Sequence, residues 1–242
     1  MLELKNWKVG IEDKEIVHGV DLKIDGIHAI MGPNGSGKST LAQSILGHPA
    51  YWTDGEIYFD GKDIKSLTTN ERAMEGIFLS FQSPPYLEGI KLKELLKKIY
   101  YLRRGYDERD LSKYKEFMEE LKKGLELLKL PPEFVEKEVN KDFSGGEKKK
   151  SEVLQMLMFK PRFAILDELD SGLDVDSLKV VSNAVLTLNI PLLIITHYNR
   201  ILKYIKPDYV HVMKEGKIVK TGPASLAEEI EEEGYETPLS HL

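Results

Sequence analysis

Residues 32–39 of this chain carry the residue types that phosphate chemistry needs. They read Gly-Pro-Asn-Gly-Ser-Gly-Lys-Ser, which matches the phosphate-loop pattern G-x-x-x-x-G-K-[ST]. Glycines allow the main chain to wrap around phosphate groups with its N–H groups turned inward, and a helix N-terminus adds partial positive charge. Lys38 can bridge the β- and γ-phosphates of a nucleotide, and the Ser39 hydroxyl can hold Mg²⁺. The predicted nucleotide-binding residues are Gly32, Pro33, Asn34, Gly35, Ser36, Gly37, Lys38, Ser39 and Thr40.

A pair of acids, Asp167 and Glu168, follows the apolar run 163–166. A strand that delivers two carboxylates at its C-terminal end suits a site at the edge of a parallel sheet. Asp167 is placed to support Mg²⁺, and Glu168 is placed to polarise a water for in-line attack on a γ-phosphate. A general base favours hydrolysis over an ATP-dependent clamp that dimerises without turnover, because a clamp needs no such base.

Both segments need particular strands and helices to position them. An apolar run at 27–31 precedes the phosphate loop, and a helical pattern follows it from Lys38 to Gly47. Residues 91–130 are helical and highly charged, with apolar residues on one helix face from Tyr114 to Leu128. We expect an α/β core from 1–82 and 161–242, interrupted by a helical subdomain at 83–160. Further strands are expected at 20–24, 55–61, 77–81, 163–166 and 192–195, a hairpin at 209–220, and helices at 176–188 and 224–233.

Composition excludes several classes of function. The 242 residues hold 34 Lys plus Arg against 40 Asp plus Glu, a net charge of −6 that argues against non-specific nucleic-acid binding. There is no cysteine, so a disulfide, a thiolate nucleophile and a Cys-ligated metal or iron–sulfur cluster are excluded within this chain. No apolar run approaches the roughly 20 residues that span a bilayer. We therefore expect a cytoplasmic protein with no signal peptide, no bound nucleic acid and no direct membrane insertion.

Four further segments make the chain resemble the ATP-binding-cassette (ABC) ATPases. Residues 143–147, Phe-Ser-Gly-Gly-Glu, resemble the family signature L-S-G-G-Q, and residues 171–174, Ser-Gly-Leu-Asp, resemble the D-loop. Gln82 and His197 sit where that family has its Q-loop glutamine and switch histidine. The resemblance covers nearly the whole chain. It implies an α/β P-loop NTPase of the ABC-ATPase type, with a mixed-sheet RecA-like core, an inserted helical subdomain and an antiparallel β subdomain.

The resemblance also implies roles for these residues. Gln82 would lie near the Mg²⁺ held by Ser39 and Asp167, and His197 would contact the γ-phosphate. Two subunits would close head-to-tail around two nucleotides, so that an isolated monomer would be a weak ATPase. The implied catalytic residues are Lys38, Gln82, Glu168 and His197. The implied cross-subunit contacts come from Ser144, Gly145, Gly146 and Glu147 of the signature, with the D-loop Asp174 coupling the two sites.

Ser144 and Glu147 also have a purely structural interpretation. Ser144 is a good helix N-cap, and Glu147 stands at the capping-box position three residues later. The structural and functional roles are compatible, and we expect both.

Two departures from the wider family matter. The region where many members place an adenine-stacking aromatic holds Ile11, Glu12 and Asp13, and Trp7 lies too early. The segment 167–174 reads Asp-Glu-Leu-Asp-Ser-Gly-Leu-Asp, without the Pro-Thr pair of many transporter subunits.

The second departure makes the chain similar to the SufC family of ABC ATPases, which serve iron–sulfur cluster assembly. Segments 144–149, 170–174, 196–201 and 204–212 carry this resemblance. It implies ATP and Mg²⁺ as ligands and a SufB and/or SufD-type scaffold as partner, docking near Ser83–Leu96. The alternative is the ATP-binding subunit of a membrane transporter, which would share the catalytic residues and differ in what docks on the helical insert.

Overall fold

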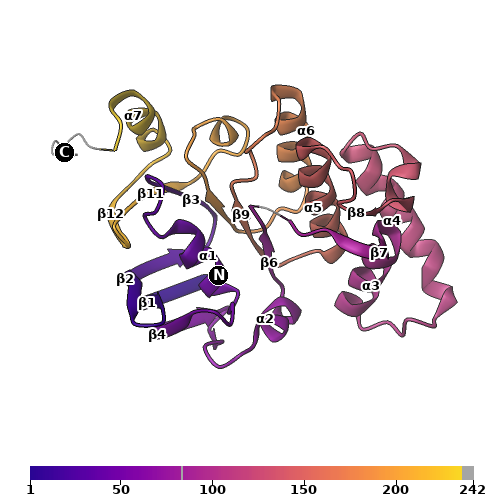
Figure 1. Cartoon of the computed structure of the whole chain (residues 1–242), viewed down its shortest axis with the longest axis horizontal. Helices are drawn as coiled ribbons and strands as arrows, with labels where there is room; N and C mark the ends of the chain where they lie inside the picture. The colour runs from indigo at the N-terminus through magenta and orange to yellow at the C-terminus, as the bar shows by residue number, and fades with distance from the viewer. Residues whose placement is uncertain (83, 236–242) are drawn as a thin grey trace. The chain divides into compact units, whose positions relative to one another are not determined.

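The computed structural model describes residues 1–82 and 84–235 of the chain, whose helices and strands are drawn in Figure 1. The chain divides into two compact units. The first unit comprises 1–81, 162–169 and 190 onward, and the second comprises 82–161 and 170–189. Each unit is described by itself below. Residue 83, the first of the predicted docking segment, lies outside the described residues.

The first unit contains two sheets. Among the described residues, one sheet has the strand order β2-β1-β4-β5 and is antiparallel, as predicted for the β subdomain. The other has the order β12-β11-β3-β10-β9-β6, in which only β12 runs antiparallel to its neighbour. This is the expected mixed sheet. Its elements and those around it are β1 Leu2–Ile11, β2 Lys14–Ile24, β3 Ile27–Met31, α1 Lys38–Ile45, β4 Trp52–Phe59, β5 Lys62–Asp63, α2 Thr69–Glu75, β6 Ile77–Ser80, β9 Phe163–Asp167, β10 Leu192–Ile195, the 3₁₀ turn Ile201–Lys203, β11 Tyr209–Lys214, β12 Lys217–Gly222 and α7 Leu226–Glu233.

Two neighbouring strands of the mixed sheet, β9 and β10, are buried along their whole length. Every residue of β9 and β10 is buried, as expected for parallel strands covered on both faces. Phe59, Phe163 and Leu193 belong to one core cluster with Leu41 of α1. The cluster therefore fixes α1, and with it the preceding phosphate loop, against the sheet.

The second unit is mainly helical. On α4 the predicted apolar face is buried at Phe117, Leu121 and Leu125, and the helix ends before Pro131. Gly124 lets α4 approach α5 closely, since a Cβ there would lie 2.7 Å from Leu154 Cδ1. The elements are β7 Leu87–Lys91, α3 Leu92–Arg104, the 3₁₀ turn Leu111–Lys113, α4 Tyr114–Leu127, the 3₁₀ turn Pro132–Glu136, β8 Glu138–Val139, α5 Gly145–Phe159 and α6 Val175–Leu186.

The division into units differs from the predicted boundaries in one segment. The prediction assigned all of 161–242 to the core, whereas 170–189, which contains α6, groups with the helical unit. The reason is that Leu178, Val181 and Val185 make α6 apolar on one side, and α6 packs against α4 and α5. Strand–helix alternation along the sequence does not reveal which unit a helix joins.

Arg72 on α2 is a buried cation in the first unit that the sequence analysis missed. Its side chain is 2% exposed. Its guanidinium donates four hydrogen bonds to main-chain oxygens, at Ser44 (3.0 Å), Ile45 (2.8 Å), Lys65 (2.9 Å) and Leu67 (3.0 Å). Two of these acceptors lie at the C-terminal end of α1, where the last carbonyls of a helix need partners.

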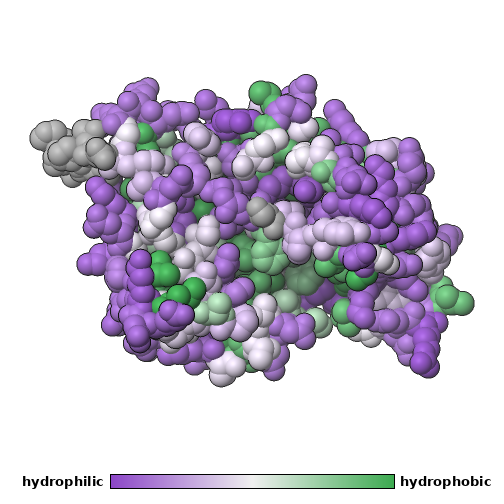
Figure 2. Space-filling view, in the orientation of Figure 1, coloured by the Kyte–Doolittle hydropathy of each residue, from purple (hydrophilic) through white to green (hydrophobic). Residues whose placement is uncertain are grey.

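Charged and polar residues cover most of the face that Figure 2 shows, as the composition predicts. No helix in residues 1–82 and 84–235 combines the length and the apolar character needed to cross a membrane.

Replacing Arg72 with Met should lower the free energy of unfolding by about 3 kcal/mol, because buried carbonyls would lose their donors. Urea denaturation measures this loss. The matched control is Lys62→Met, which removes an exposed cation paired with Glu75 and should cost less than about 1 kcal/mol. Equal small losses in both variants would contradict the structural role of Arg72.

Candidate functional site

The phosphate loop connects β3 to α1 and leaves the start of α1 without a side-chain cap. Gly37 is the N-cap residue of α1, with φ 102°, and it has no side chain to offer. By contrast, Thr68, Ser144 and Asp174 each cap their helices by accepting a main-chain N–H. The first N–H groups of α1 are therefore not engaged by a side chain of their own cap, which suits an anion.

Lys38, the first residue of α1, is the buried cation of this loop. Only 5% of the residue is exposed. Its ammonium group donates to the carbonyls of Gly32 and Pro33, both at 2.8 Å, and lies 3.4 Å from Ser36 Oγ. Burial lowers the pKa of Lys38, while the carboxylates of Glu168 and Asp167 act in the opposite direction. The ammonium is thus oriented by the loop and faces the two predicted acids.

Gly32 has no room for a side chain. A Cβ at this position would lie 2.1 Å from the carbonyl oxygen of Met213 on β11. The loop is also tied to the turn between β11 and β12, because Gly216 N–H donates to Ser36 O at 2.9 Å. These contacts hold the loop against the sheet, while Asn34 and Gly35 at its tip are exposed.

Asp167 and Ser39 are brought together, as a metal site would require. Asp167 ends β9 and is 2% exposed, and its Oδ1 accepts a hydrogen bond from Ser39 Oγ at 3.2 Å. In the described residues no three acidic, His or Cys side chains gather to bind a metal by themselves. A hydroxyl and one carboxylate fit Mg²⁺, which usually combines one or two protein carboxylates with water and phosphate oxygens.

Glu168 and His197 are in direct contact. Glu168 Oε1 pairs with His197 Nε2, and His197 Nδ1 lies 3.2 Å from the Gly32 carbonyl oxygen. An imidazole protonated at both nitrogens can donate to both oxygens. Glu168 adopts φ 51°, a left-handed conformation that costs free energy in a non-glycine residue and that often occurs at functional sites. Its main-chain N–H is anchored to the Ile195 carbonyl at 2.9 Å.

The remaining predicted site residues belong to the second unit. The capping box predicted at the signature is confirmed: Glu147 N–H donates to Ser144 Oγ (3.2 Å) and Ser144 N–H donates to Glu147 Oε2 (2.8 Å). The latter bond is the main cause that lowers the pKa of Glu147. Ser144 and Gly145 are exposed and Gly146 is half-buried, so this helix start is accessible in the monomer.

Asp174 and Gln82 have their own local contacts in the second unit. Asp174 caps α6 by accepting Ser177 N–H at 2.7 Å, a bond that lowers the pKa of Asp174. The exposed Gln82 uses its main-chain carbonyl to accept a hydrogen bond from Lys149 Nζ at 3.2 Å. Asp174 therefore stabilises the start of α6 irrespective of any contact with a second subunit.

Trp7 and Tyr235 are two aromatic residues of the first unit, and only the first was considered in the sequence analysis. Trp7 is fully buried, and its indole N–H donates to Ser44 Oγ at 3.0 Å, so it is a core residue and presents no face to an adenine. Tyr235 was missed by the sequence analysis, yet its hydroxyl faces the main chain of His197. No local pattern marks it, since it follows α7, far from the motifs in sequence.

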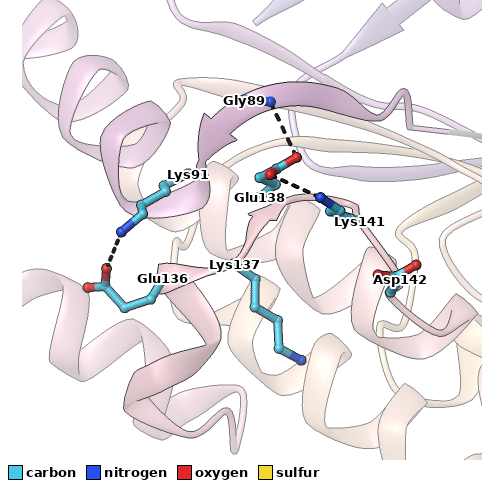
Figure 3. Close-up of a pocket in the computed structure, with 7 residues that line it drawn as sticks. All are labelled: Gly89, Lys91, Glu136, Lys137, Glu138, Lys141 and Asp142. Carbon is cyan, nitrogen blue, oxygen red and sulfur yellow. Dashed lines mark hydrogen bonds and ion pairs between the residues drawn. The ribbon is translucent and has the colours of Figure 1, made fainter.

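An open cavity of about 460 Å³ lies in the second unit and includes part of the predicted docking segment (Figure 3). Glu138 is its central acid, bonded to Gly89 N–H (3.3 Å) and Lys141 Nζ (3.1 Å). The hydroxyl of Tyr86 also donates to Glu138, and this bond is the main cause that lowers the pKa of Glu138 to about 2. The cavity is lined by Gly89, Lys91, Glu136, Lys137, Glu138, Lys141 and Asp142.

Comparison with known proteins gives one consistent family. The family model described as ABC transporter matches residues 18–171. Vegetative protein 296 of Bacillus subtilis is 47% identical, over 97% of this chain and 92% of its own length. The probable ATP-dependent transporter ycf16 of Cyanophora paradoxa is also 47% identical, over 98% of this chain and 93% of its own length.

Solved structures agree with this result. MJ1267, an ATP-binding cassette of an ABC transporter, superposes with a TM-score of 0.75 at 30% identity, covering 95% of this chain and 94% of its own. The dimeric structure of MJ0796, a bacterial ABC transporter cassette, gives a TM-score of 0.78, covering 93% of this chain and 99% of its own. Its 21% identity shows the shared fold alone.

Replacing Lys38 with Met should weaken Mg²⁺-ATP binding about 100-fold, because charge-assisted hydrogen bonds to phosphate would be lost. Calorimetric titration with a non-hydrolysable ATP analogue measures the affinity. Lys14→Met, an exposed lysine of β2, is the control and should bind normally. Unchanged affinity in the Lys38 variant would show that phosphates bind elsewhere.

Proposed function

The chain belongs to the ABC transporter family of ATPases, and we propose that it is a SufC-type member that drives conformational change in an iron–sulfur cluster scaffold. One observation carries the ATPase part of this proposal. Lys38 and His197 both contact the Gly32 carbonyl, while Asp167 and Glu168 stand beside them at the end of β9. A cation, a metal-binding carboxylate and a general base thus lie within one unit.

We propose that ATP binds with its β- and γ-phosphates in the loop 32–40. Lys38 would exchange its carbonyl acceptors for phosphate oxygens, and the N–H groups at the start of α1 would face the same oxygens. Ser39, Asp167 and Gln82 would hold Mg²⁺, which neutralises charge that develops on the phosphate oxygens.

Glu168 would act as the general base. Its carboxylate would accept a proton from the water that attacks the γ-phosphorus, while the bond to the bridging oxygen breaks and ADP leaves. His197 pairs with this carboxylate in the structure. When ATP is bound, the His197 imidazole would also donate a hydrogen bond to the γ-phosphate. The pair therefore links the base to the presence of the γ-phosphate.

Hydrolysis would be completed by a second copy of the chain. The exposed start of α5, with Ser144, Gly145, Gly146 and the capping Glu147, would face the γ-phosphate bound by the other subunit, and Asp174 would couple the two sites. The MJ0796 cassette, which shares the fold, has been solved as a dimer, and this is consistent with the pairing of two copies. Because charge stabilisation is incomplete without the second helix N-terminus, an isolated monomer would hydrolyse ATP slowly.

The SufC-type assignment is supported by segments 144–149, 170–174, 196–201 and 204–212, which resemble that family. The lack of cysteine is consistent with cluster ligation by a partner. We propose that a SufB and/or SufD-type scaffold docks at residues 84–96, where Tyr86 is 46% exposed and donates to Glu138. Glu138 lines the cavity of Figure 3. The names of relatives as ATP-dependent transporters favour the alternative, an ATP-binding subunit of a membrane transporter.

Detergent-free affinity purification from the native host separates these two functions. Scaffold subunits that co-elute with iron and sulfide would support the SufC-type assignment, and a partner recovered only from the membrane fraction would support transport. Tyr86→Ala combined with Leu87→Ala serves as the control, since it should lose the partner while keeping nucleotide affinity. Loss of both would indicate a folding defect.

Replacing Glu168 with Gln should lower kcat at least about 100-fold while leaving ATP affinity within a few-fold, because only the proton acceptor is lost. Steady-state phosphate release measures kcat. The control is Glu215→Gln, an exposed glutamate of the same unit that also has a positive φ, and it should keep full turnover. Full turnover in the Glu168 variant would remove Glu168 from its proposed role.

A further inference from the structure

The segment after α7 reaches the loop that carries His197. The hydroxyl of the half-buried Tyr235 donates a hydrogen bond to the His197 carbonyl at 3.5 Å. The backbone of Gly32 interacts with the same hydroxyl and partly offsets the effect of burial, which raises the pKa of Tyr235. Tyr235 therefore contacts the main chain of His197.

A second contact ties the same two segments together. Asn199, which is 4% exposed, donates from Nδ2 to Glu231 Oε2 on α7 at 3.1 Å. Between these contacts the chain makes a tight turn, in which Thr196 Oγ1 accepts from Tyr198 N–H at 3.1 Å and lies 3.0 Å from Tyr198 O. The turn 196–199 is thus fastened to the C-terminal segment at two points.

Helix α7, which carries Glu231 and precedes Tyr235, is itself packed within the first unit. It can therefore hold the turn 196–199 in a fixed position. Leu226, Ala227 and Ile230 bury one face of α7, and Lys220 of β12 pairs with Glu229 at 3.6 Å. A helix held in this way restricts the groups at its exposed end.

The His197 ring is attached to the main chain that Tyr235 contacts, and its Nδ1 lies 3.2 Å from the Gly32 carbonyl oxygen. The path of the main chain at 196–199 therefore decides where the ring lies. We infer that Tyr235 and Glu231 are positioning residues, which hold the turn 196–199 so that the His197 imidazole meets Glu168. This inference rests on the proposed role of His197 and Glu168 in ATP hydrolysis, and neither Tyr235 nor Glu231 is assigned a contact with substrate.

Tyr235→Phe tests this inference, because it removes the hydroxyl and keeps the ring. We expect kcat for ATP hydrolysis to fall about 5-fold with KM within 2-fold, as for loss of a group that orients a catalytic side chain. The melting temperature should change by only a few degrees, since a single hydrogen bond contributes little to the free energy of unfolding. Glu231→Ala should act in the same direction, and Glu231→Gln, which keeps an acceptor oxygen, should restore turnover.

Tyr58→Phe is the matched control, since it also removes one tyrosine hydroxyl and one hydrogen bond, to the exposed Glu56 on β4. It should leave kcat unchanged. An unaltered kcat in the Tyr235 variant would overturn the inference. So would a fall in kcat accompanied by a comparable rise in KM and a large drop in the melting temperature.

A second measurement does not depend on turnover. In ¹H–¹³C NMR spectra of the imidazole rings, Tyr235→Phe should shift the His197 signals, identified with His197→Ala, and leave those of the remote His48 unchanged. Unshifted His197 signals would overturn the inference even if the enzyme is active. A wild-type protein without ATPase activity would instead contradict the proposed function, and the NMR result would still decide whether Tyr235 positions the ring.

Discussion

The structure depends on keeping one ammonium group, that of Lys38, away from bulk water but fully hydrogen-bonded. A buried cation without partners is expensive, and here the carbonyls of Gly32 and Pro33 supply the acceptors while Asp167 and Glu168 supply opposite charge. Those carbonyls face the ammonium because the loop lies tightly against β11. Only glycine fits at position 32, since a Cβ there would clash with the Met213 carbonyl oxygen. The parallel strands β3 and β9 bring these groups together. The phosphate loop follows β3 and the two acids lie at the end of β9, so both reach the same edge of the sheet.

The helix starts differ in whether a side chain caps them, and this distinguishes α1 from α2, α5 and α6. The side chains of Thr68, Ser144 and Asp174 each accept a main-chain N–H at the start of their own helix. The starts of α2, α5 and α6 are therefore capped within the chain. Gly37 offers no side chain to the start of α1. Ser144 of the signature segment caps the start of α5 and yet remains exposed. Its structural role therefore leaves it accessible.

Much of the site could be predicted because its signals are local. The phosphate loop, the acids after an apolar strand and the Ser144–Glu147 capping box each lie within a few residues, and backbone chemistry at that range has few solutions. Arg72, Tyr235 and the assignment of α6 to the helical unit could not be predicted. Each depends on contacts between residues far apart in sequence, and neither a lone arginine nor a tyrosine after the last helix carries a pattern. The roles toward a nucleotide remain predictions for every site residue: Lys38, Ser39, Gln82, Asp167, Glu168, Asp174, His197 and the signature.

The strand order of the mixed sheet has a consequence for how the protein is made. The phosphate loop follows β3, whose neighbours in the sheet are β10 and β11, strands that leave the ribosome only after most of the chain has been synthesised. Until then β3 is an apolar strand with unpaired edges, and its partners must be recruited across a long loop at a high entropic cost. The antiparallel sheet β2-β1-β4-β5 contains only early strands and can form first. Nucleotide binding therefore arises late in folding, and β3 lacks both of its sheet neighbours for most of synthesis.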